Sequence, residues 1–275
     1  MTAVDVHAVV EGPPDRPALV LSPSLGSSLD MWEPQVAALR DQFRVVRYDH
    51  RGHGRSPVPP APYQIADLTE DVIRLLDRLD ITAAHFCGIS LGAMTGMVLA
   101  ATYPRRVRRL VLCCTTARMP TPQAYGQRAA AVRRDGTAAI AESVVARWVT
   151  PGFAADHPEL VKHLQAMVAD TPDEGYAACC EALERMDLRG LLPRISAPTL
   201  LIAGAEDSAT PPDQAERIAA GIPNAQVQVL SPAAHLASIE QPETVTRLLV
   251  SHLTATEAPH ARGPDRPSAR HAGAP

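Results

Sequence analysis

At the centre of this sequence stands the run Cys87-Gly88-Ile89-Ser90-Leu91-Gly92, which has the pattern Gly-x-Ser-x-Gly. Strand-like residues lead into it at 83–87, and an apolar helical pattern leaves it over 94–101. A serine placed between a strand and a helix in this way is typical of the nucleophile elbow, a turn so sharp that residues without a Cβ must flank the serine. The run therefore predicts that the Ser90 hydroxyl projects from the sheet edge as a nucleophile, and that the Leu91 N–H can stabilise an oxyanion.

Strands and helices alternate on both sides of this elbow. Short apolar or alternating runs predict strands at 4–10, 18–21, 43–48, 107–114, 197–204 and 226–230, and longer amphipathic patterns predict helices at 31–39, 65–79, 214–220 and 242–253. This alternation is typical of right-handed β-α-β units, so it predicts an α/β fold with a mainly parallel sheet.

The domain organisation follows from a change of pattern in the middle of the chain. Residues 1–116 and 193–253 form the two parts of the α/β core, and residues 117–192 contain helical segments without a convincing strand, which predicts a helical cap inserted between two strands. Residues 254–275 contain no Ile, Leu, Val, Met or aromatic residue but four prolines, and this composition predicts a disordered C-terminal tail.

Composition narrows the functional classes. The 275 residues are 46% hydrophobic with a formal net charge of −4 and no block of like charge, so nothing indicates a nucleic acid or a membrane surface as a partner. The five cysteines have no spacing typical of a disulfide framework or a metal site, and the N-terminus lacks the features of a signal peptide. We therefore expect a cytoplasmic protein that acts on a small molecule.

A serine nucleophile requires a histidine to accept its proton and an acid to fix the tautomer of that histidine. In the chain order serine, acid, histidine that accompanies this elbow, the histidine is predicted to be His235, in the loop between the last strand and the last helix. Asp207, just past the strand at 197–204, is the preferred acid, and Glu206 is the alternative. Residues 114–117, after the preceding strand, contain no acid.

The loop at 22–26 follows the strand at 18–21 and is built from residues that allow a close approach of the backbone. We expect the Leu25 N–H to be the second oxyanion donor, with a plain strand-to-helix connection as the alternative. The polar turn at 49–56 is expected to be structural: Asp49 and Arg51 lock it, and His50 and His53 hydrogen-bond within it. His85, inside the elbow strand, is expected to be a core residue with its hydrogen bonds satisfied.

Taken together, the elbow and the segments at 21–32, 49–56, 204–212 and 234–242 resemble the α/β-hydrolase superfamily. Within it, the chain is similar over residues 4–253 to the 3-oxoadipate enol-lactonases of the β-ketoadipate pathway of aromatic catabolism. The narrower similarity rests on the loop at 22–26 and on several cap segments: Arg147-Trp148 before Phe153, residues 173–179, Ala182-Leu183 and Asp187-Leu188. The chain departs from the family at Ala93, where many relatives have glycine, and at Tyr125, where tryptophan is usual.

The resemblance implies an α/β-hydrolase fold, with a mainly parallel eight-stranded sheet flanked by helices and a helical cap. It also implies a cofactor-free serine hydrolase that opens an enol-lactone to an oxo acid through an acyl-enzyme. The alternatives are a general carboxylesterase or biosynthetic lactonase of the same fold, and a receptor-like protein that binds a lactone with little turnover.

An enol-lactone derived from a dicarboxylate carries a free carboxylate, which needs a cation if it is buried. Because the chain is net acidic, we expect that cation to be local, and Arg147 beside Trp148 in the cap is the candidate for substrate binding. The alternative is a surface arginine beside a core tryptophan. Arg133 and Arg134 are the reserve candidates.

Overall fold

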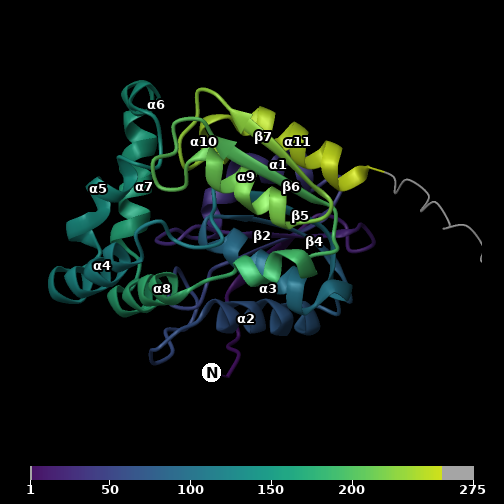
Figure 1. Ribbon diagram of the computed structural model, residues 1–275, viewed down its shortest axis with the longest axis horizontal. Helices are drawn as coiled ribbons and strands as arrows, with labels where there is room; N and C mark the ends of the chain where they lie inside the picture. Colours follow the sequence, from purple (N-terminus) through teal and green to yellow (C-terminus); the bar gives the residue numbers. More distant parts are fainter. Residues whose placement is uncertain (1, 256–275) are drawn as a thin grey trace, which may run out of the picture.

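The structure is a computed structural model that describes residues 2–255 (Figure 1). The predicted disordered tail therefore lies outside the described residues, apart from Thr254 and Ala255, and Thr254 is the last residue of a helix. No helix within residues 2–255 is long and apolar enough to cross a membrane.

Seven strands within the described residues form one sheet in the order β1-β3-β2-β4-β5-β6-β7. They are β1 (Ala8–Glu11), β2 (Ala18–Ser22), β3 (Arg44–Tyr48), β4 (Ala84–Ile89), β5 (Val107–Cys113), β6 (Thr199–Gly204) and β7 (Ala225–Leu230). Only β1 pairs antiparallel, with β3, and every other neighbouring pair is parallel. Every residue of β2, β4 and β6 is buried, as expected for strands covered on both faces.

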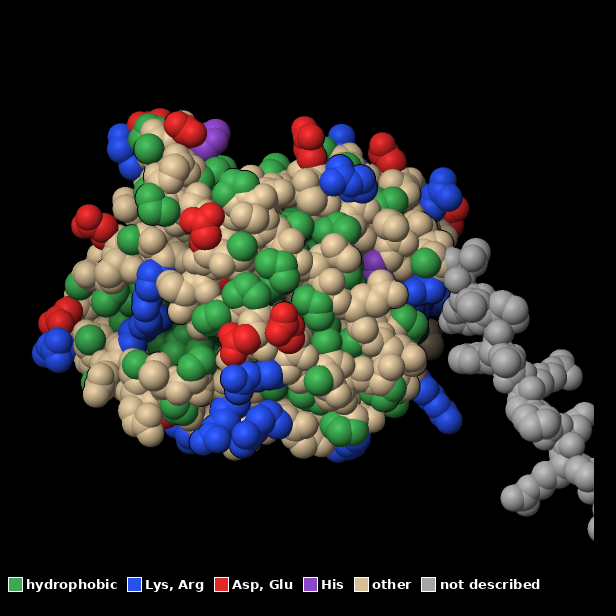
Figure 2. All heavy atoms as spheres, turned by 45° about the horizontal axis from the view of Figure 1, so that its top comes forward, with side chains coloured by type: hydrophobic (Ala, Val, Ile, Leu, Met, Phe, Trp, Pro, Cys, Tyr) green, Lys and Arg blue, Asp and Glu red, His purple; other side chains and the backbone are tan. Residues whose placement is uncertain are grey.

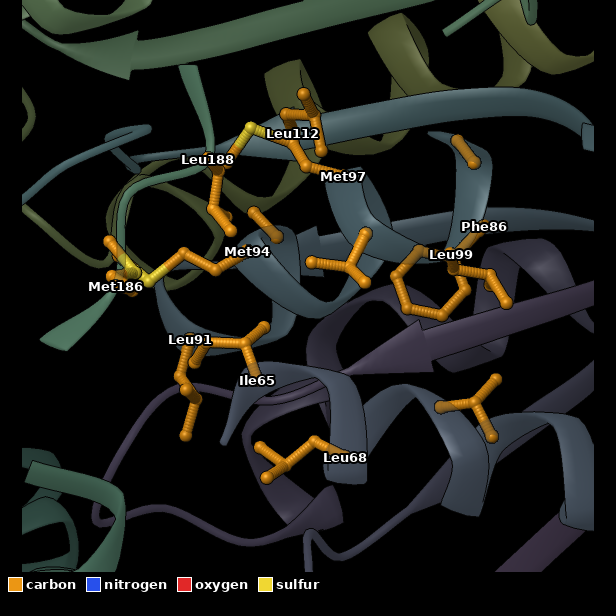
Figure 3. Packing of buried hydrophobic residues seen from close by; sticks show 14 of the residues in the cluster. Ile65, Leu68, Phe86, Leu91, Met94, Met97, Leu99, Leu112, Met186 and Leu188 are labelled. Atoms are coloured by element: carbon orange, nitrogen blue, oxygen red, sulfur yellow. The ribbon is translucent and has the colours of Figure 1, made fainter. Parts of the chain in front are cut away.

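Helices cover the two faces of the sheet with two separate hydrophobic clusters. One face carries α2 (Ile65–Arg78), α3 (Leu91–Thr102) and α9 (Pro212–Gly221), and the other carries α1 (Glu33–Leu39), α10 (Ala237–Glu240) and α11 (Pro242–Thr254). Figure 3 shows Ile65 and Leu68 of α2 packed beneath Leu91 and Met94 of α3, and Phe86 of the sheet beside Leu99 farther along α3. This packing fixes α3, and with it the elbow at its first turn, against the centre of the sheet.

The segment between β5 and β6 forms a layer of helices beyond the edge of the sheet, on the left in Figure 1. Its helices are α4 (Pro122–Asp135), η3 (Ala138–Ile140), α5 (Ala141–Val145), α6 (Pro151–Asp156), α7 (Pro158–Ala169) and α8 (Asp173–Arg185), and the chain then returns to the core through η4 (Arg189–Arg194), which packs against α3 and α9. We call residues 117–192 the cap. Two further short 3-10 helices, η1 (Leu29–Trp32) and η2 (Pro104–Arg106), belong to the α/β part of the chain outside the cap.

The α/β fold class and its mainly parallel sheet are confirmed, but the sheet has seven strands in the described residues and the implied count of eight is wrong. The predicted strand at 4–10 forms only at β1, because the preceding backbone bonds to side chains of α2 instead of to another strand. The Val4 N–H donates to Asp71 Oδ1 at 2.7 Å, and Arg78 donates to the Val6 carbonyl at 2.8 Å.

Candidate active site

The elbow lies between β4 and α3, and its backbone is strained. Ser90 has φ 54° and ψ −116°, a conformation that residues with side chains rarely adopt. A Cβ on Gly88 would lie 2.3 Å from the Gly92 backbone, and a Cβ on Gly92 would lie 2.3 Å from the Ser22 carbonyl oxygen. Any side chain at either position would therefore clash with the backbone, so both residues must be glycine. Leu91 is the first residue of α3, so its N–H belongs to the first helical turn, where no helical carbonyl accepts it.

Asp207 follows β6 and His235 follows β7, so adjacent parallel strands bring the two side chains to the same edge of the sheet. His235 Nδ1 lies 2.8 Å from Asp207 Oδ2, and both residues are buried. Glu206, the alternative acid, is exposed. Thr210, which the sequence did not single out, donates its hydroxyl to Asp207 Oδ2 at 2.7 Å, and its N–H donates to Oδ1 at 2.9 Å.

The electrostatics of Asp207 favour the ionised carboxylate. Burial alone would raise the pKa of Asp207, but the charge of His235 and the hydrogen bonds from His235 and Thr210 outweigh burial, so the pKa lies below its usual value. An ionised carboxylate only accepts hydrogen bonds, so Nδ1 of His235 carries a proton. Nε2 of the neutral ring is then the atom that can accept a proton from a nucleophile.

A cavity of about 300 Å³ lies between the core and the cap. Ser90, His235 and Leu25 line it from the core side, and Arg147 and Trp148 line it from the cap side. Figure 2 shows a hollow lined by hydrophobic side chains at the boundary between cap and core, with basic side chains at its edge. The structure thus brings the sequence-predicted nucleophile, base and second oxyanion residue to one cavity.

The loop that carries Leu25 is held by the turn at 49–56. His50 Nε2 lies 3.0 Å from the Pro23 carbonyl oxygen, and the Gly26 N–H donates to His53 Nε2 at 3.0 Å. The expectation that both histidines bond within their own turn is therefore wrong for these atoms, although His53 Nδ1 does lie 3.2 Å from the carbonyl oxygen of Arg51 in that turn. Short-range sequence patterns do not reveal contacts between two such loops.

Asp49 and Arg51 have the structural role in this turn that the sequence indicates, but they also join it to η1 and α2. Asp49 accepts the N–H groups of Leu29 and Arg55, and Arg51 forms a buried ion pair with Asp71, with an N–O distance of 2.6 Å. His85 is a core residue, but its hydrogen bonds are not all satisfied, because its Nδ1 has no partner among the described residues.

The two reserve arginines of the cap have other roles. Arg133 binds Glu174 and Glu181, and Arg134 binds Asp135 at 2.6 Å on the exposed surface. Their charges are therefore compensated away from the cavity.

Arg128 lines the cavity and was missed by sequence reasoning. Its guanidinium carbon lies 4.9 Å from the centre of the Tyr125 ring, one turn earlier on α4, a spacing that could have indicated the pair. Partial burial and the charge of Arg128 lower the pKa of Arg147. No carboxylate within residues 2–255 forms an ion pair with either arginine at 4.0 Å or less. Two uncompensated cations at one wall make this cavity suited to an anion.

Trp148 is 5% exposed, and its carbonyl oxygen accepts the Leu236 N–H at 2.7 Å. Because Leu236 follows His235, this bond ties the cap, at the segment just after α5, to the loop that carries the histidine. A tryptophan that lines the cavity and is anchored in this way can shape one wall of a binding site.

Comparison with known proteins gives consistent results. A family model described as alpha/beta hydrolase fold matches residues 17–242. The chain is 44% identical over 245 residues to 3-oxoadipate enol-lactonase 2 of Acinetobacter baylyi, a match that covers 88% of this chain and 91% of the relative.

Solved structures agree with the sequence relatives. The enol-lactonase from Burkholderia xenovorans LB400 superposes with a TM-score of 0.90 at 41% identity, covering 92% of this chain and 99% of that one. A thermophilic esterase from Thermogutta terrifontis, solved with malate bound, superposes with a TM-score of 0.85 at 31% identity, covering 91% and 93%.

Proposed function

The chain belongs to the alpha/beta hydrolase family, and from this premise we propose that it is a serine hydrolase that opens 3-oxoadipate enol-lactone to 3-oxoadipate. The observation that carries the proposal is the composition of one cavity, which is lined by Ser90, by His235 and by two arginines that have no acidic partner within residues 2–255. The similarity to enol-lactonases at 44% and 41% identity supports the same substrate class.

In the first half of the reaction, Ser90 Oγ attacks the lactone carbonyl carbon while His235 Nε2 accepts the serine proton. Asp207 stabilises the imidazolium that forms. The N–H groups of Leu25 and Leu91 donate to the oxyanion of the tetrahedral intermediate, and each such donor is worth about 3–4 kcal/mol in comparable enzymes. Cleavage of the C–O bond of the ring then releases the ring oxygen as an enol, which takes the proton from His235.

In the second half, the enol tautomerises to a ketone while the acyl group stays on Ser90. His235 Nε2 accepts a proton from water, and the resulting hydroxide attacks the acyl carbon. Collapse of the second tetrahedral intermediate breaks the bond to Ser90 Oγ, which takes its proton back from His235 and releases the oxo acid.

The cap supplies recognition of the substrate carboxylate. Arg147, with its planar donor fork, binds that carboxylate, and Arg128 adds a second positive charge at the same wall. Trp148 covers the apolar part of the ring. Burial of an unpaired carboxylate costs several kcal/mol, so these cations decide between a charged lactone and a neutral ester.

A second candidate function is a carboxylesterase, favoured by the similarity to the Thermogutta esterase over nearly the whole chain. A carboxylesterase would use the same catalytic groups, and only the acyl part of its substrate would differ. We place the enzyme in the cytoplasm, because all five cysteines lie within residues 2–255 as free, buried thiols, and disulfides are rare in that compartment.

The test compares initial rates on freshly generated 3-oxoadipate enol-lactone with those on a panel of neutral esters and lactones of similar size. We expect kcat/KM for the enol-lactone to exceed that for each neutral compound by at least about tenfold, since one well-placed charge contact is worth more than 1.4 kcal/mol. Equal or higher kcat/KM on neutral esters would support the carboxylesterase instead. Stoichiometric binding without turnover of any compound would support a receptor.

A further inference from the structure

Two imidazoles hold the loop that carries the second oxyanion donor. Pro23 and Gly26 flank Leu25 closely in the chain, and each bonds to a histidine of the turn at 49–56. His50 Nε2 lies 3.0 Å from the Pro23 carbonyl oxygen, and His53 Nε2 accepts the Gly26 N–H at 3.0 Å. The backbone is therefore held by a histidine on each side of Leu25.

The protonation state of His53 follows from its two contacts. Its Nδ1 lies 3.2 Å from the Arg51 carbonyl oxygen, which can only accept, so Nδ1 carries the proton. Nε2 is then free of a proton and can accept the Gly26 N–H. Only the neutral ring in this tautomer makes both bonds. Burial lowers the pKa of His53 to about 4 and that of His50 to about 3, so both rings are neutral near pH 7.

The opposite side of the loop is closed by the cap. Gly26 has φ 75°, and a Cβ at this position would lie 2.7 Å from the ring of Tyr176 on α8. The backbone at Gly26 thus lies between an aromatic ring and an imidazole. Loss of the imidazole acceptor would leave a buried N–H without a partner, which favours a shift of the loop or entry of water.

We propose that His53 is a positioning residue for the oxyanion hole: its neutral Nε2 holds the Gly26 N–H and thereby directs the neighbouring Leu25 N–H toward the oxyanion formed at Ser90. This inference rests on the proposed serine-hydrolase function, and it adds a residue that does not touch the substrate. The effect is confined to the transition state, because a lactone carbonyl requires less of the hole than a full oxyanion does.

The test uses a pair of polar substitutions at the same site. In His53→Asn the amide can still reach the Arg51 carbonyl oxygen but is too short to reach Gly26, whereas in His53→Gln the longer side chain can offer its oxygen to the Gly26 N–H. His85→Asn is the matched control, because His85 is also a buried histidine but lies on β4 outside the cavity. Should His53→Asn not fold, His53→Met replaces it, since methionine fills buried space without a polar atom to desolvate.

Four quantities are measured for each variant: kcat per active site titrated by burst release, KM, the inhibition constant of an alkyl boronic acid, and the dissociation constant of 3-oxoadipate. The boronic acid reports the oxyanion hole, because Ser90 Oγ bonds to boron, the serine proton passes to His235, and an anionic tetrahedral adduct results. The oxo acid reports binding without that adduct.

For His53→Asn we expect kcat and boronate affinity to fall at least about tenfold, while KM and the affinity for 3-oxoadipate change by less than about threefold. His53→Gln should recover most of the lost kcat, and His85→Asn should keep the parent kcat. Unchanged kcat per active site in His53→Asn, or equal loss of boronate and oxo acid affinity, would overturn the inference. A parent protein that hydrolyses no ester or lactone would instead contradict the proposed function.

Discussion

Two buried aspartates, Asp49 and Asp207, follow parallel strands of the same sheet and yet have opposite electrostatic surroundings. Asp49 follows β3 and accepts the N–H groups of Leu29 and Arg55. Asp207 follows β6, accepts backbone N–H groups in the same way, and in addition lies 2.8 Å from His235 Nδ1. Burial raises the pKa of Asp49, whereas for Asp207 the histidine and Thr210 outweigh burial and lower the pKa.

Burial at the end of a strand is therefore not enough to make a carboxylate the acid of a catalytic triad. Asp49 holds backbone groups of two loops and has no ion-pair partner in the part of the chain that the structure describes. Asp207 holds the ring of His235, which lines the cavity, through the 2.8 Å contact between its Oδ2 and Nδ1 of the ring. The side chain opposite the carboxylate decides which role it takes.

The largest expected effect comes from substituting each aspartate with asparagine. Asp207→Asn should lower kcat by about 10⁴-fold, because the amide favours the wrong tautomer of His235. Asp49→Asn should lower kcat by less than about tenfold but should reduce the free energy of unfolding by about 1–3 kcal/mol, because the amide cannot accept both backbone N–H groups equally well. Steady-state kinetics and denaturant unfolding measure the two quantities.

If Asp49→Asn loses as much kcat as Asp207→Asn while both variants remain folded, the two aspartates do not have the different roles assigned to them. Glu206→Gln is the matched control for Asp207, since Glu206 is its exposed neighbour. A greater loss in that control than in Asp207→Asn would mean that the acid is misassigned.

The same contrast between a group at the cavity and a group held elsewhere applies to the arginines. Arg147→Ala should raise KM for the enol-lactone at least about tenfold, because one decade corresponds to about 1.4 kcal/mol, and should leave KM for a neutral ester almost unchanged. Arg133→Ala is the control, because Arg133 is bound to Glu174 and Glu181. Equal losses on both substrates would mean that Arg147 only maintains the cap.

A smaller effect is expected from Thr210, whose hydroxyl supports Asp207. Thr210→Val removes that donor. We expect kcat to fall by about tenfold, because a hydrogen bond to a charged group is worth about 1.5 kcal/mol and this energy corresponds to about one decade in rate. Thr210→Ser retains the hydroxyl and should keep most of the activity. If Thr210→Val has the parent kcat, the carboxylate does not depend on the hydroxyl.

Much of this arrangement follows from the sequence, because parallel strands bring their carboxyl ends to one edge. The elbow at Ser90 and the loops with Asp207 and His235 could therefore be predicted as neighbours from chain order alone. Thr210, Arg128 and the bonds of His50 and His53 could not, since they depend on how two loops or two layers meet. The N-terminal segment was mispredicted for a similar reason: its alternating pattern suits a strand, but its backbone groups bond to Asp71 and Arg78 of α2.

The smallest expected change is in how the free energy of unfolding depends on pH under acidic conditions. Because the native pKa of Asp207 is lowered from 3.8, this group stabilises the fold above that value, and its contribution is lost as the pH falls through the native pKa. The native pKa of Asp49 is raised from 3.8, so its contribution is present below that value and is lost as the pH rises.

Unfolding free energies measured from about pH 6 to about pH 3 check these signs. The difference between parent and Asp207→Asn should shrink on acidification, and the difference between parent and Asp49→Asn should grow. If the free energy of unfolding of the two variants depends on pH in the same way, the two aspartates do not differ electrostatically as proposed.

The role of Ser90 as the nucleophile is tested most sharply by the hydrolysis of freshly generated 3-oxoadipate enol-lactone by the parent and by Ser90→Ala, measured as the loss of the enol-lactone chromophore. We expect rapid ring opening by the parent and a loss of about 10⁴-fold or more in kcat for Ser90→Ala, with the circular dichroism spectrum and Tm unchanged. A folded Ser90→Ala variant that retains most of the parent activity would contradict this role.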